Sequence, residues 1–227
     1  MTGILASVAS LKEASALVSL PIDILDLKNP ALGALGALEL KDVHRIVETF
    51  PDQCISATVG DLPMVPEVVG RAVDAMAEAG VDYVKIGFFD SGEWQPVLDQ
   101  LKPVADRGVK LVAVLFADQA FSLSVLPAFK AAGFEGIMVD TADKTRGGLL
   151  AYRELSWLEG FVQVGRSLGC LTGLAGSLSL GDIPKLKPLG ADYLGFRGAL
   201  CAESRTGALD LSSAIRVCAA MAAHDGS

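Results

Sequence analysis

Lysine and aspartate stand close together at the ends of several apolar stretches of this sequence. Lys28 ends one such stretch, with Asp26 two positions before it, and Lys85 stands inside another. A third lysine, Lys144, follows Asp140 by four positions. Because burying an unpaired ammonium is costly, three such placements indicate that the amines are used chemically.

Clustered lysines are typical of catalysis by amines. A neighbouring cation destabilises an ammonium, and the neutral amine can then attack a carbonyl carbon to form a Schiff base. Lowering a lysine pKa from about 10.4 to about 7 requires roughly 4 to 5 kcal/mol of differential interaction, which a second lysine in a low-dielectric interior supplies. Nearby aspartates then keep one lysine charged and relay protons. For any single pair the alternative is an ion pair that only closes the end of a fold.

The elements that must position these side chains follow from the period of the sequence. Eight apolar runs alternate with eight amphipathic stretches, and near-continuous apolar runs are typical of parallel strands covered on both faces. The expected strands are 3–8, 22–27, 53–59, 82–87, 109–116, 135–140, 171–175 and 192–196, and the expected helices lie near 10–19, 40–49, 65–79, 93–106, 122–132, 147–168, 179–188 and 209–223.

Eight alternations favour an α/β fold with a single (β/α)8 TIM barrel as one domain over residues 1–227. Local signals agree, because Ser10 and Glu13 have the spacing of a capping box. Glycines at 80, 133 and 190 stand where a left-handed residue ends a helix. The alternative, an open dinucleotide-binding sheet, requires a glycine-rich turn after the first strand, and residues 9–11 contain no glycine.

Alternation along strands predicts which side chains face the barrel interior. In the fourth strand, Val84 and Ile86 are apolar and are expected to face the helices. Lys85, which stands between them, is then expected to point into the barrel. The full inward set expected at the carboxyl-terminal mouth and below it is Ile22, Ile24, Asp26, Lys28, Lys85, Met138 and Asp140, with Lys144 and Asp118 on loops at the same end.

The loops after the seventh and eighth strands contain Gly176, Ser177, Arg197 and Gly198. Barrels often bind phosphate there through backbone N–H groups and a hydroxyl, and Arg197 adds a fork of donors that suits phosphate oxygens. Ordinary turns have the same composition, so the interpretation rests on position. We expect Gly176, Ser177, Arg197, Gly198 and Asp118 to contact the substrate or its phosphate.

The segment 29–37 carries no charge and is long for a connection between a strand and a helix. It either covers the mouth and keeps water from an imine or packs as an ordinary loop. Ser56, Thr58 and this loop are the candidates for holding a second phosphate group.

Composition excludes several classes of function. A formal net charge of −8, from 19 basic and 27 acidic residues, disfavours binding to nucleic acid or to an anionic membrane. The apolar runs are too short for a membrane span, and the first residues lack the basic region of a secretory signal, so we expect a cytoplasmic protein. We also expect a homo-oligomer. Neither a metal site nor a disulfide framework is indicated by two histidines and four scattered cysteines, Cys54, Cys170, Cys201 and Cys218.

Six motifs along almost the whole chain resemble one known family. They are Asp-Leu-Lys-Asn-Pro-x-x-Gly-x-Leu-Gly-Ala (26–37), Ser-Ala-Thr-Val-Gly-Asp-x-Pro (56–63), Asp-Tyr-Val-Lys-Ile-Gly (82–87), Asp-Thr-Ala-x-Lys (140–144), Ala-Gly-Ser (175–177) and Arg-Gly-Ala-x-Cys (197–201). The resemblance is to (5-formylfuran-3-yl)methyl phosphate synthase of methanofuran biosynthesis, also called 4-(hydroxymethyl)-2-furancarboxaldehyde-phosphate (4-HFC-P) synthase.

The resemblance implies a (β/α)8 barrel that condenses two molecules of glyceraldehyde 3-phosphate into a furan aldehyde. One phosphate and two waters are lost without redox change, so no cofactor is implied. It also implies that Lys28 forms the Schiff base, that Lys85 accepts a proton, and that Lys144, Asp26 and Asp140 assist. Which lysine carries the imine stays open, because lysines in such barrels can exchange roles.

The loop after Lys144, Thr-Arg-Gly-Gly at 145–148, departs from the archaeal type of this family. This difference is consistent with a branch of the family that is found in methylotrophic bacteria and is linked to one-carbon metabolism.

Other functions fit parts of the pattern. A class I aldolase acting on phosphorylated sugars also uses a lysine in a barrel, and it releases no phosphate. A decarboxylase with an Asp-x-Lys charge array forms no Schiff base. A non-catalytic barrel that binds a phosphorylated metabolite and regulates a partner has no need for all five charged residues.

Overall fold

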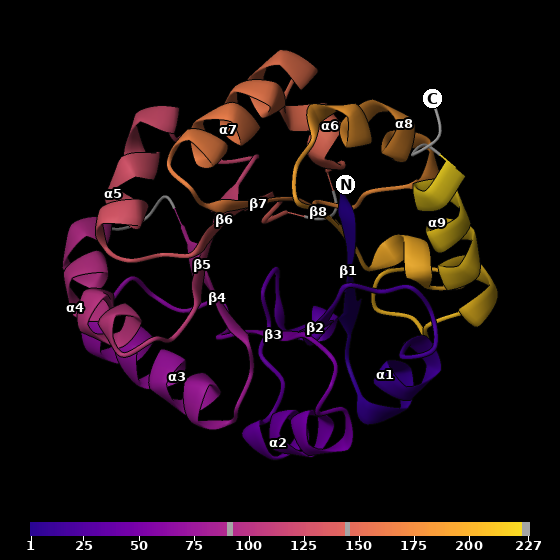
Figure 1. Ribbon diagram of the computed structural model, residues 1–227, viewed down its shortest axis with the longest axis horizontal. Helices are drawn as coiled ribbons and strands as arrows, with labels where there is room; N and C mark the ends of the chain where they lie inside the picture. Colours follow the sequence, from indigo (N-terminus) through magenta and orange to yellow (C-terminus); the bar gives the residue numbers. More distant parts are fainter. Residues whose placement is uncertain (90–92, 144–145, 224–227) are drawn as a thin grey trace.

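The eight strands form one closed parallel barrel in which each strand pairs with the next and β8 pairs with β1 (Figure 1). The computed structural model describes residues 1–89, 93–143 and 146–223. Helices surround the ring of strands on its outside. The (β/α)8 barrel expected from the sequence is confirmed.

All eight expected strands are present, shortened at some ends. They are β1 (Gly3–Val8), β2 (Ile24–Leu27), β3 (Ile55–Thr58), β4 (Tyr83–Phe88), β5 (Leu111–Phe116), β6 (Gly136–Asp140), β7 (Leu171–Leu174) and β8 (Tyr193–Phe196). The helices are α1 (Leu11–Leu17), α2 (Leu40–Thr49), α3 (Pro66–Glu78), α4 (Trp94–Asp106), α5 (Leu126–Ala131), α6 (Leu149–Tyr152), α7 (Leu155–Ser167), α8 (Ile183–Leu186) and α9 (Leu211–Ala223). Short 3-10 turns are η1 (Pro30–Leu32), η2 (Leu123–Val125), η3 (Leu180–Asp182), η4 (Lys187–Leu189) and η5 (Gly198–Leu200).

Some helices differ from the expectation. The helix expected near 147–168 is divided into α6 and α7, because Arg153 has an extended backbone with φ −132° and ψ 131°. The helix expected near 179–188 is the short α8 between two 3-10 turns. The glycines at 80, 133 and 190 do take positive φ angles of 84°, 85° and 74°, which confirms them as helix ends.

The capping box at the first helix is present in modified form. Ser10 Oγ accepts a hydrogen bond from the backbone N–H of Glu13 at 3.2 Å. The Glu13 carboxylate accepts in turn from the N–H of Ala9 at 2.7 Å. The glutamate therefore reaches one residue further back than in the usual capping box.

Apolar side chains form two separate clusters, one between strands and helices and one inside the barrel. Val84 and Ile86 pack in the outer cluster, as expected. Ile22 also packs there, contrary to the expected inward placement, because β2 begins only at Ile24. The inner cluster consists of Leu5, Ile24, Ala34, Leu35, Val114, Phe116, Met138 and Ala175.

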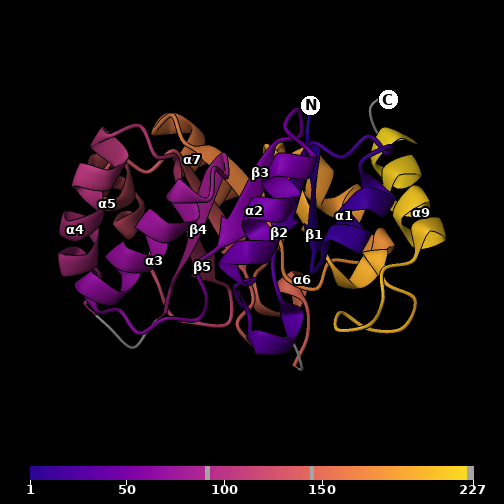
Figure 2. The same cartoon turned by 90° about the horizontal axis from the view of Figure 1, so that it is seen from below.

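Strand register brings polar side chains to one level of the barrel. Asp26 on β2 pairs with Ser7 on β1 and with Ser56 on β3. Phe116 at the end of β5 pairs with Asp140 at the end of β6. In Figure 2 the loops after β2 and β8 project from the same edge, opposite the N-terminus. The carboxyl ends of the strands and their loops thus enclose one mouth, where barrel enzymes hold their active sites.

Candidate active site

A cavity of about 730 Å³ opens at this mouth. Asp26, Lys28, Lys85 and Asp140 all contribute to its wall, so the structure brings together the four described residues of the expected catalytic set. Lys144, the fifth, lies outside the described residues. The rest of the wall comes mainly from the loops 175–181 and 197–205.

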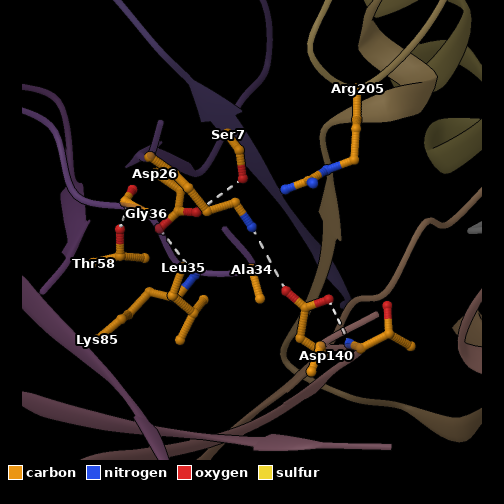
Figure 3. A network of polar contacts seen from close by, with 12 residues as sticks. Ser7, Asp26, Ala34, Leu35, Gly36, Thr58, Lys85, Asp140 and Arg205 are labelled. Carbon is orange, nitrogen blue, oxygen red and sulfur yellow. Dashed lines mark hydrogen bonds and ion pairs between the residues drawn. The ribbon is translucent and has the colours of Figure 1, made fainter. Parts of the chain in front are cut away.

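The carboxylate of Asp26 is completely buried and has three side-chain donors. Lys85 Nζ lies 2.9 Å from its Oδ1, and Lys85 is 3% exposed. Ser56 Oγ donates to the same oxygen at 2.7 Å, and Ser7 Oγ donates to Oδ2 at 2.8 Å. Figure 3 shows the contacts of Asp26 with Lys85 and Ser7. The hydroxyls reach the carboxylate because both serines are its register partners on the adjacent strands.

Nearby charges and burial shift the pKa of Asp26 in opposite directions. Burial alone raises the pKa of this carboxyl, but Lys85, Lys28 and the Ser56 hydroxyl together lower the pKa below its ordinary value. Asp26 is therefore an anion at neutral pH. An ionised carboxylate that is fully buried requires a fixed cation, and Lys85 supplies one.

The second lysine–aspartate pair, Lys28 with Asp140, has a longer contact distance than the pair of Lys85 with Asp26. Lys28 Nζ lies 3.6 Å from Asp140 Oδ2, which is an ion pair beyond ordinary hydrogen-bond length. Asp140 Oδ1 accepts the backbone N–H of Thr141 at 2.7 Å, which orients the carboxylate at the end of β6. Both side chains are nearly buried, at 7% and 4% exposure. Lys28 thus lines the cavity beside the Asp140 carboxylate, at a longer distance than the one that separates Lys85 from Asp26.

The uncharged segment 29–37 folds into the barrel mouth. Leu35 is fully buried in the inner cluster, and its side chain occupies the space above Gly87, where an added Cβ would lie 2.7 Å from Leu35 Cδ1. Asp61 fixes the loop by accepting the N–H groups of Ala34 at 2.8 Å and Leu35 at 2.7 Å. The loop therefore packs into the inner cluster of the barrel.

The loop after β7 has a strained backbone beside the cavity. Gly176 has φ 116°, and Ser177, with φ 49°, is the one non-glycine residue of the described chain with a positive φ. Such a conformation costs an ordinary residue roughly 1–2 kcal/mol. No acceptor among the described residues contacts the backbone N–H groups of Ser177 and Gly198, and both residues line the cavity. These N–H groups are available to an anion.

Arg197, which the sequence suggested as a phosphate ligand, has all its donors bonded within the protein. Its guanidinium contacts both carboxylate oxygens of Glu13, at 2.5 and 3.2 Å. The remaining N–H groups donate to carbonyl oxygens of Ser7, Arg205 and Gly207, at 3.2, 2.8 and 3.0 Å. All five donors of an arginine are thereby used within the protein. Arg197 holds the loop after β8 in place and has no donor left for a ligand.

Asp118 is also placed differently from the expectation. Its two carboxylate oxygens accept the backbone N–H groups of Ala142 at 2.8 Å and Asp143 at 2.7 Å. The residue is absent from the cavity wall formed by the described residues. Asp118 therefore orders the backbone of the loop that leads to Lys144.

Ser56 and Thr58, the candidates for a second phosphate, are likewise used internally. Ser56 donates to Asp26, and Thr58 Oγ1 donates to the carbonyl of Gly36 at 3.1 Å. Both side chains are buried, at 2% and 0% exposure. Their hydroxyls support the charged pair and the loop after β2.

Several residues in the cavity wall were missed by sequence reasoning, among them Ser7, Arg205 and Arg216. Ser7 is a polar residue at an inward position of an apolar strand, which was a usable signal. Arg205 lies in an irregular loop, and Arg216 lies on α9, where an arginine resembles a solvent-exposed residue. The Arg216 guanidinium donates to Ser213 Oγ at 2.8 Å, and both residues line the cavity.

The described part of the chain contains no group of three His, Cys, Asp or Glu side chains arranged to hold a metal ion. Within the same residues, no helix has the length and hydropathy to cross a bilayer. The polar side chains that line the cavity are amines, carboxylates, hydroxyls and guanidinium groups.

Solved structures share this fold. The 3-hexulose-6-phosphate synthase of Salmonella typhimurium superposes with a TM-score of 0.72 over 98% of this chain and 100% of that chain, at 17% identity. The 3-keto-L-gulonate-6-phosphate decarboxylase of Vibrio cholerae has a TM-score of 0.69 over 98% of this chain and 96% of that chain, at 14% identity. At these identities the likeness shows the barrel alone.

Sequence comparison gives a closer relationship. A (5-formylfuran-3-yl)methyl phosphate synthase of Archaeoglobus fulgidus is 32% identical over 217 residues, covering 89% of this chain and 92% of its own. The (5-formylfuran-3-yl)methyl phosphate synthase of Methanocaldococcus jannaschii is 34% identical over 211 residues, covering 87% of this chain and 89% of its own. A Methylorubrum extorquens protein, to which the same activity is provisionally assigned, is 37% identical over 209 residues, covering 91% of this chain and 86% of its own. The family model for 4-HFC-P synthase matches residues 4–217. This chain belongs to the 4-HFC-P synthase family.

Proposed function

We propose that this enzyme condenses two molecules of glyceraldehyde 3-phosphate into (5-formylfuran-3-yl)methyl phosphate, with loss of one phosphate and two waters, in the biosynthesis of a methanofuran-type cofactor. The name shared by its relatives supports this activity. The observation that carries the proposal is the pair of buried lysine–aspartate contacts in the wall of one cavity. Amines and carboxylates in such a site supply the nucleophile and the proton transfers of a condensation.

Lys28 is the proposed Schiff-base residue. Its neutral amine attacks the carbonyl carbon of one triose, and loss of water gives an imine. To attack, the amine must leave its carboxylate partner. The 3.6 Å contact of Lys28 Nζ with Asp140 is longer than the 2.9 Å contact of Lys85 Nζ with Asp26, which favours Lys28 over Lys85 for this role. The imine then acidifies the neighbouring C–H bond, which prepares that triose for expulsion of phosphate and for joining the second triose.

Lys85 and Asp26 are the proposed proton-transfer pair. The Asp26 carboxylate is held by Lys85 and two serine hydroxyls, so the pair is fixed in place before substrate binds. Preorganised charges of this kind stabilise charge that develops in a transition state without further rearrangement. Asp140 and Lys144 are proposed to assist imine formation, phosphate elimination and dehydration.

One substrate phosphate is proposed to bind between the loops after β7 and β8. The backbone N–H groups of Ser177 and Gly198, beside Gly176, provide donors there, together with Ser177 Oγ. Arg197 acts indirectly, since it anchors the second of these loops through carbonyl oxygens. Asp118 acts on the site through the loop that it orders.

Trapping with borohydride in the presence of glyceraldehyde 3-phosphate tests the proposed mechanism. The wild-type protein is expected to form a covalent adduct on Lys28, and Lys28→Ala and Lys28→Arg to form none. Lys102→Ala, at an exposed ion pair on α4, is the matched control and should react as wild type. An undiminished adduct in Lys28→Ala would move the imine to Lys85 or Lys144.

Product analysis tests the reaction itself. One phosphate should be released for every two trioses consumed, with a furan aldehyde as product. An aldol product without phosphate release would indicate a class I aldolase. Tight binding of triose phosphate without adduct or turnover would indicate a non-catalytic barrel.

A further inference from the structure

Arg205 presents an incompletely bonded guanidinium to the cavity. It lies on the loop after β8, is half-buried and forms part of the cavity wall. Its Nη2 donates to the carbonyl oxygen of Gly33 at 3.0 Å. No other acceptor for this guanidinium is found among the described residues. An arginine has five N–H donors, so four of them have no acceptor among the described residues, and the side chain lines the cavity.

The charge on Arg205 is partly removed from water. Burial lowers its pKa, Asp140 and Asp61 oppose that shift, and Arg197 adds to it. A guanidinium remains protonated under such conditions, because its ordinary pKa lies far above neutrality. A partly desolvated cation with unused donors is stabilised most by an anion that accepts several hydrogen bonds, and phosphate has the matching geometry.

Neighbouring contacts hold Arg205 in position from two sides. The backbone carbonyl of Arg205 accepts from Arg197 Nε at 2.8 Å, which anchors the residue to its own loop. Its guanidinium contacts the loop after β2 through Gly33. Figure 3 shows the side chain extending from its loop toward the network that contains Ser7, Asp26 and Asp140. Arg205 therefore joins the two loops at the level of the charged pairs.

The proposed reaction requires two anion sites, because each triose brings a phosphate group. The loops after β7 and β8 offer backbone donors for one of them. In the product, the carbon chain that ends in the aldehyde carries no phosphate, so that triose has lost it from the carbon β to the aldehyde. When an amine has attacked that aldehyde carbon, the departing phosphate is close to the imine, and its binding group must lie near Lys28 and Asp140.

We infer that Arg205 binds the phosphate group that is eliminated, an assignment that rests on the proposed function. In this step a base removes the proton from the carbon next to the imine, and its electron pair forms a carbon–carbon double bond. The C–O bond to phosphate breaks, and that electron pair leaves with the phosphate. The guanidinium stabilises the charge that develops on the leaving oxygen without transferring a proton. No oxidant or reductant takes part.

Two variants at Arg205 test the inference in single-turnover experiments. Arg205→Gln should still form the borohydride-trapped adduct on Lys28, but it should release phosphate at least about a hundredfold more slowly, since removal of one such donor group costs about 10²–10³ in rate. Mass spectrometry should find the trapped adduct still carrying its phosphate. Arg205→Lys should recover part of the rate, because a single ammonium replaces the fork. Arg71→Gln, an exposed arginine on α3, is the matched control and should match wild type in both measurements.

Binding of inorganic phosphate, followed by equilibrium titration without substrate, separates this inference from the proposed function. Arg205→Gln should bind inorganic phosphate at least about tenfold more weakly than wild type, as expected when a charge-assisted hydrogen bond is lost. Equal phosphate binding, or phosphate release at the wild-type rate, would overturn the role of Arg205. Weaker phosphate binding in the variant, combined with a wild-type protein that neither forms an adduct nor releases phosphate from glyceraldehyde 3-phosphate, would support the anion site and overturn the proposed function.

A purely structural role for Arg205 predicts a different result. If the arginine only anchors the loop after β2 through Gly33, Arg205→Gln should reduce adduct formation and phosphate release by the same factor. It should also lower the melting temperature. That pattern would overturn the inference, whereas selective loss of phosphate release with an unchanged melting curve supports it.

Discussion

Lys85 donates a hydrogen bond to Asp26 across 2.9 Å inside the barrel, and their side chains are 3% and 0% exposed. Removing one member of such a pair leaves the other charge buried without a partner. Asp26→Asn should therefore lower the free energy of unfolding by about 3–5 kcal/mol, as measured by urea denaturation. Ser56→Ala is the graded control, because it removes one hydrogen bond and should cost only about 1 kcal/mol. Equal stability of Asp26→Asn and wild type would mean that the pair is not a fixed ion pair.

The stabilisation from Asp26 should depend on pH in the acid range. Since the pKa of this carboxyl is lowered by folding from its ordinary value of 3.8, its contribution is complete above that value. It is lost as the pH falls through the lower value of the folded state. The stability difference between wild type and Asp26→Asn should stay constant from pH 7 to about pH 5 and shrink below 3.8. A difference that grows toward low pH would have the wrong sign.

Gly33 should tolerate no side chain. It has φ 122°, and an added Cβ would lie 2.0 Å from Asp61 Oδ2, the oxygen that accepts the N–H of Ala34. Gly33→Ala should displace the loop after β2 and reduce kcat by about a hundredfold, the usual result of shifting a positioned group by about 1 Å. Steady-state kinetics of purified protein provide the measurement.

Gly108→Ala is the matched control for Gly33. Gly108 has a positive φ of 92°, but a Cβ added there would meet nothing within 4 Å. We expect a loss of stability of about 1–3 kcal/mol from the backbone alone and an unchanged kcat. A similar fall of kcat in both variants would show that steric contact with Asp61 is not the cause.

Arg197 should affect substrate binding through the loop after β8, which it anchors. Arg197→Met leaves the Glu13 carboxylate nearly buried without its cation and releases the carbonyl oxygens of Arg205 and Gly207. Its stability should fall by about 3–5 kcal/mol, and KM for the triose should rise more than kcat falls, because the loop after β8 is less ordered. Arg107→Met, at an exposed pair with Asp74, should cost at most about 1 kcal/mol. A normal KM in folded Arg197→Met would contradict the positioning role.

Two substitutions at Ser177 separate the effect of backbone strain on stability from the effect of the hydroxyl on substrate binding. Ser177→Gly removes the penalty of a positive φ, whereas Ser177→Ala keeps it, so the glycine variant should be the more stable by about 1 kcal/mol. Both lack the hydroxyl, and both should raise KM for the triose phosphate by a similar factor, on the order of tenfold. A KM restored to the wild-type value in Ser177→Gly would mean that backbone shape, and not the hydroxyl, governs binding.

Local patterns are sufficient to predict the barrel and its charged centre. Glycines such as Gly80 and Gly133 end helices through their own backbone freedom, and alternation alone directs Lys85 and Asp26 inward. These features depend on neighbours within a few residues. The position of Ile22 was predicted wrongly because strand parity was extended beyond the residue where pairing begins.

Long-range partners account for most of what the sequence could not show. Arg197 has the residue type and position of a phosphate ligand, but Glu13, far away along the chain, occupies its donors. Asp118 likewise faces the right end of the barrel and is used by the backbone of the next loop. Arg205 was missed because an irregular loop has no period from which to infer its direction. Which donors remain unused is decided by the folded arrangement of the whole barrel.

The contact of Glu13 with Arg197 links residues 184 positions apart, and this has a consequence for biosynthesis. At a translation rate of 5–20 residues per second, the glutamate that caps the first helix waits roughly ten to forty seconds for its arginine to leave the ribosome. Until then the Glu13 carboxylate lacks the guanidinium that it contacts in the folded barrel. The end of the barrel that is proposed to hold phosphate is therefore incomplete until β8 and the loop after it have been synthesised, and a truncated nascent chain ending before β8 lacks that end of the site.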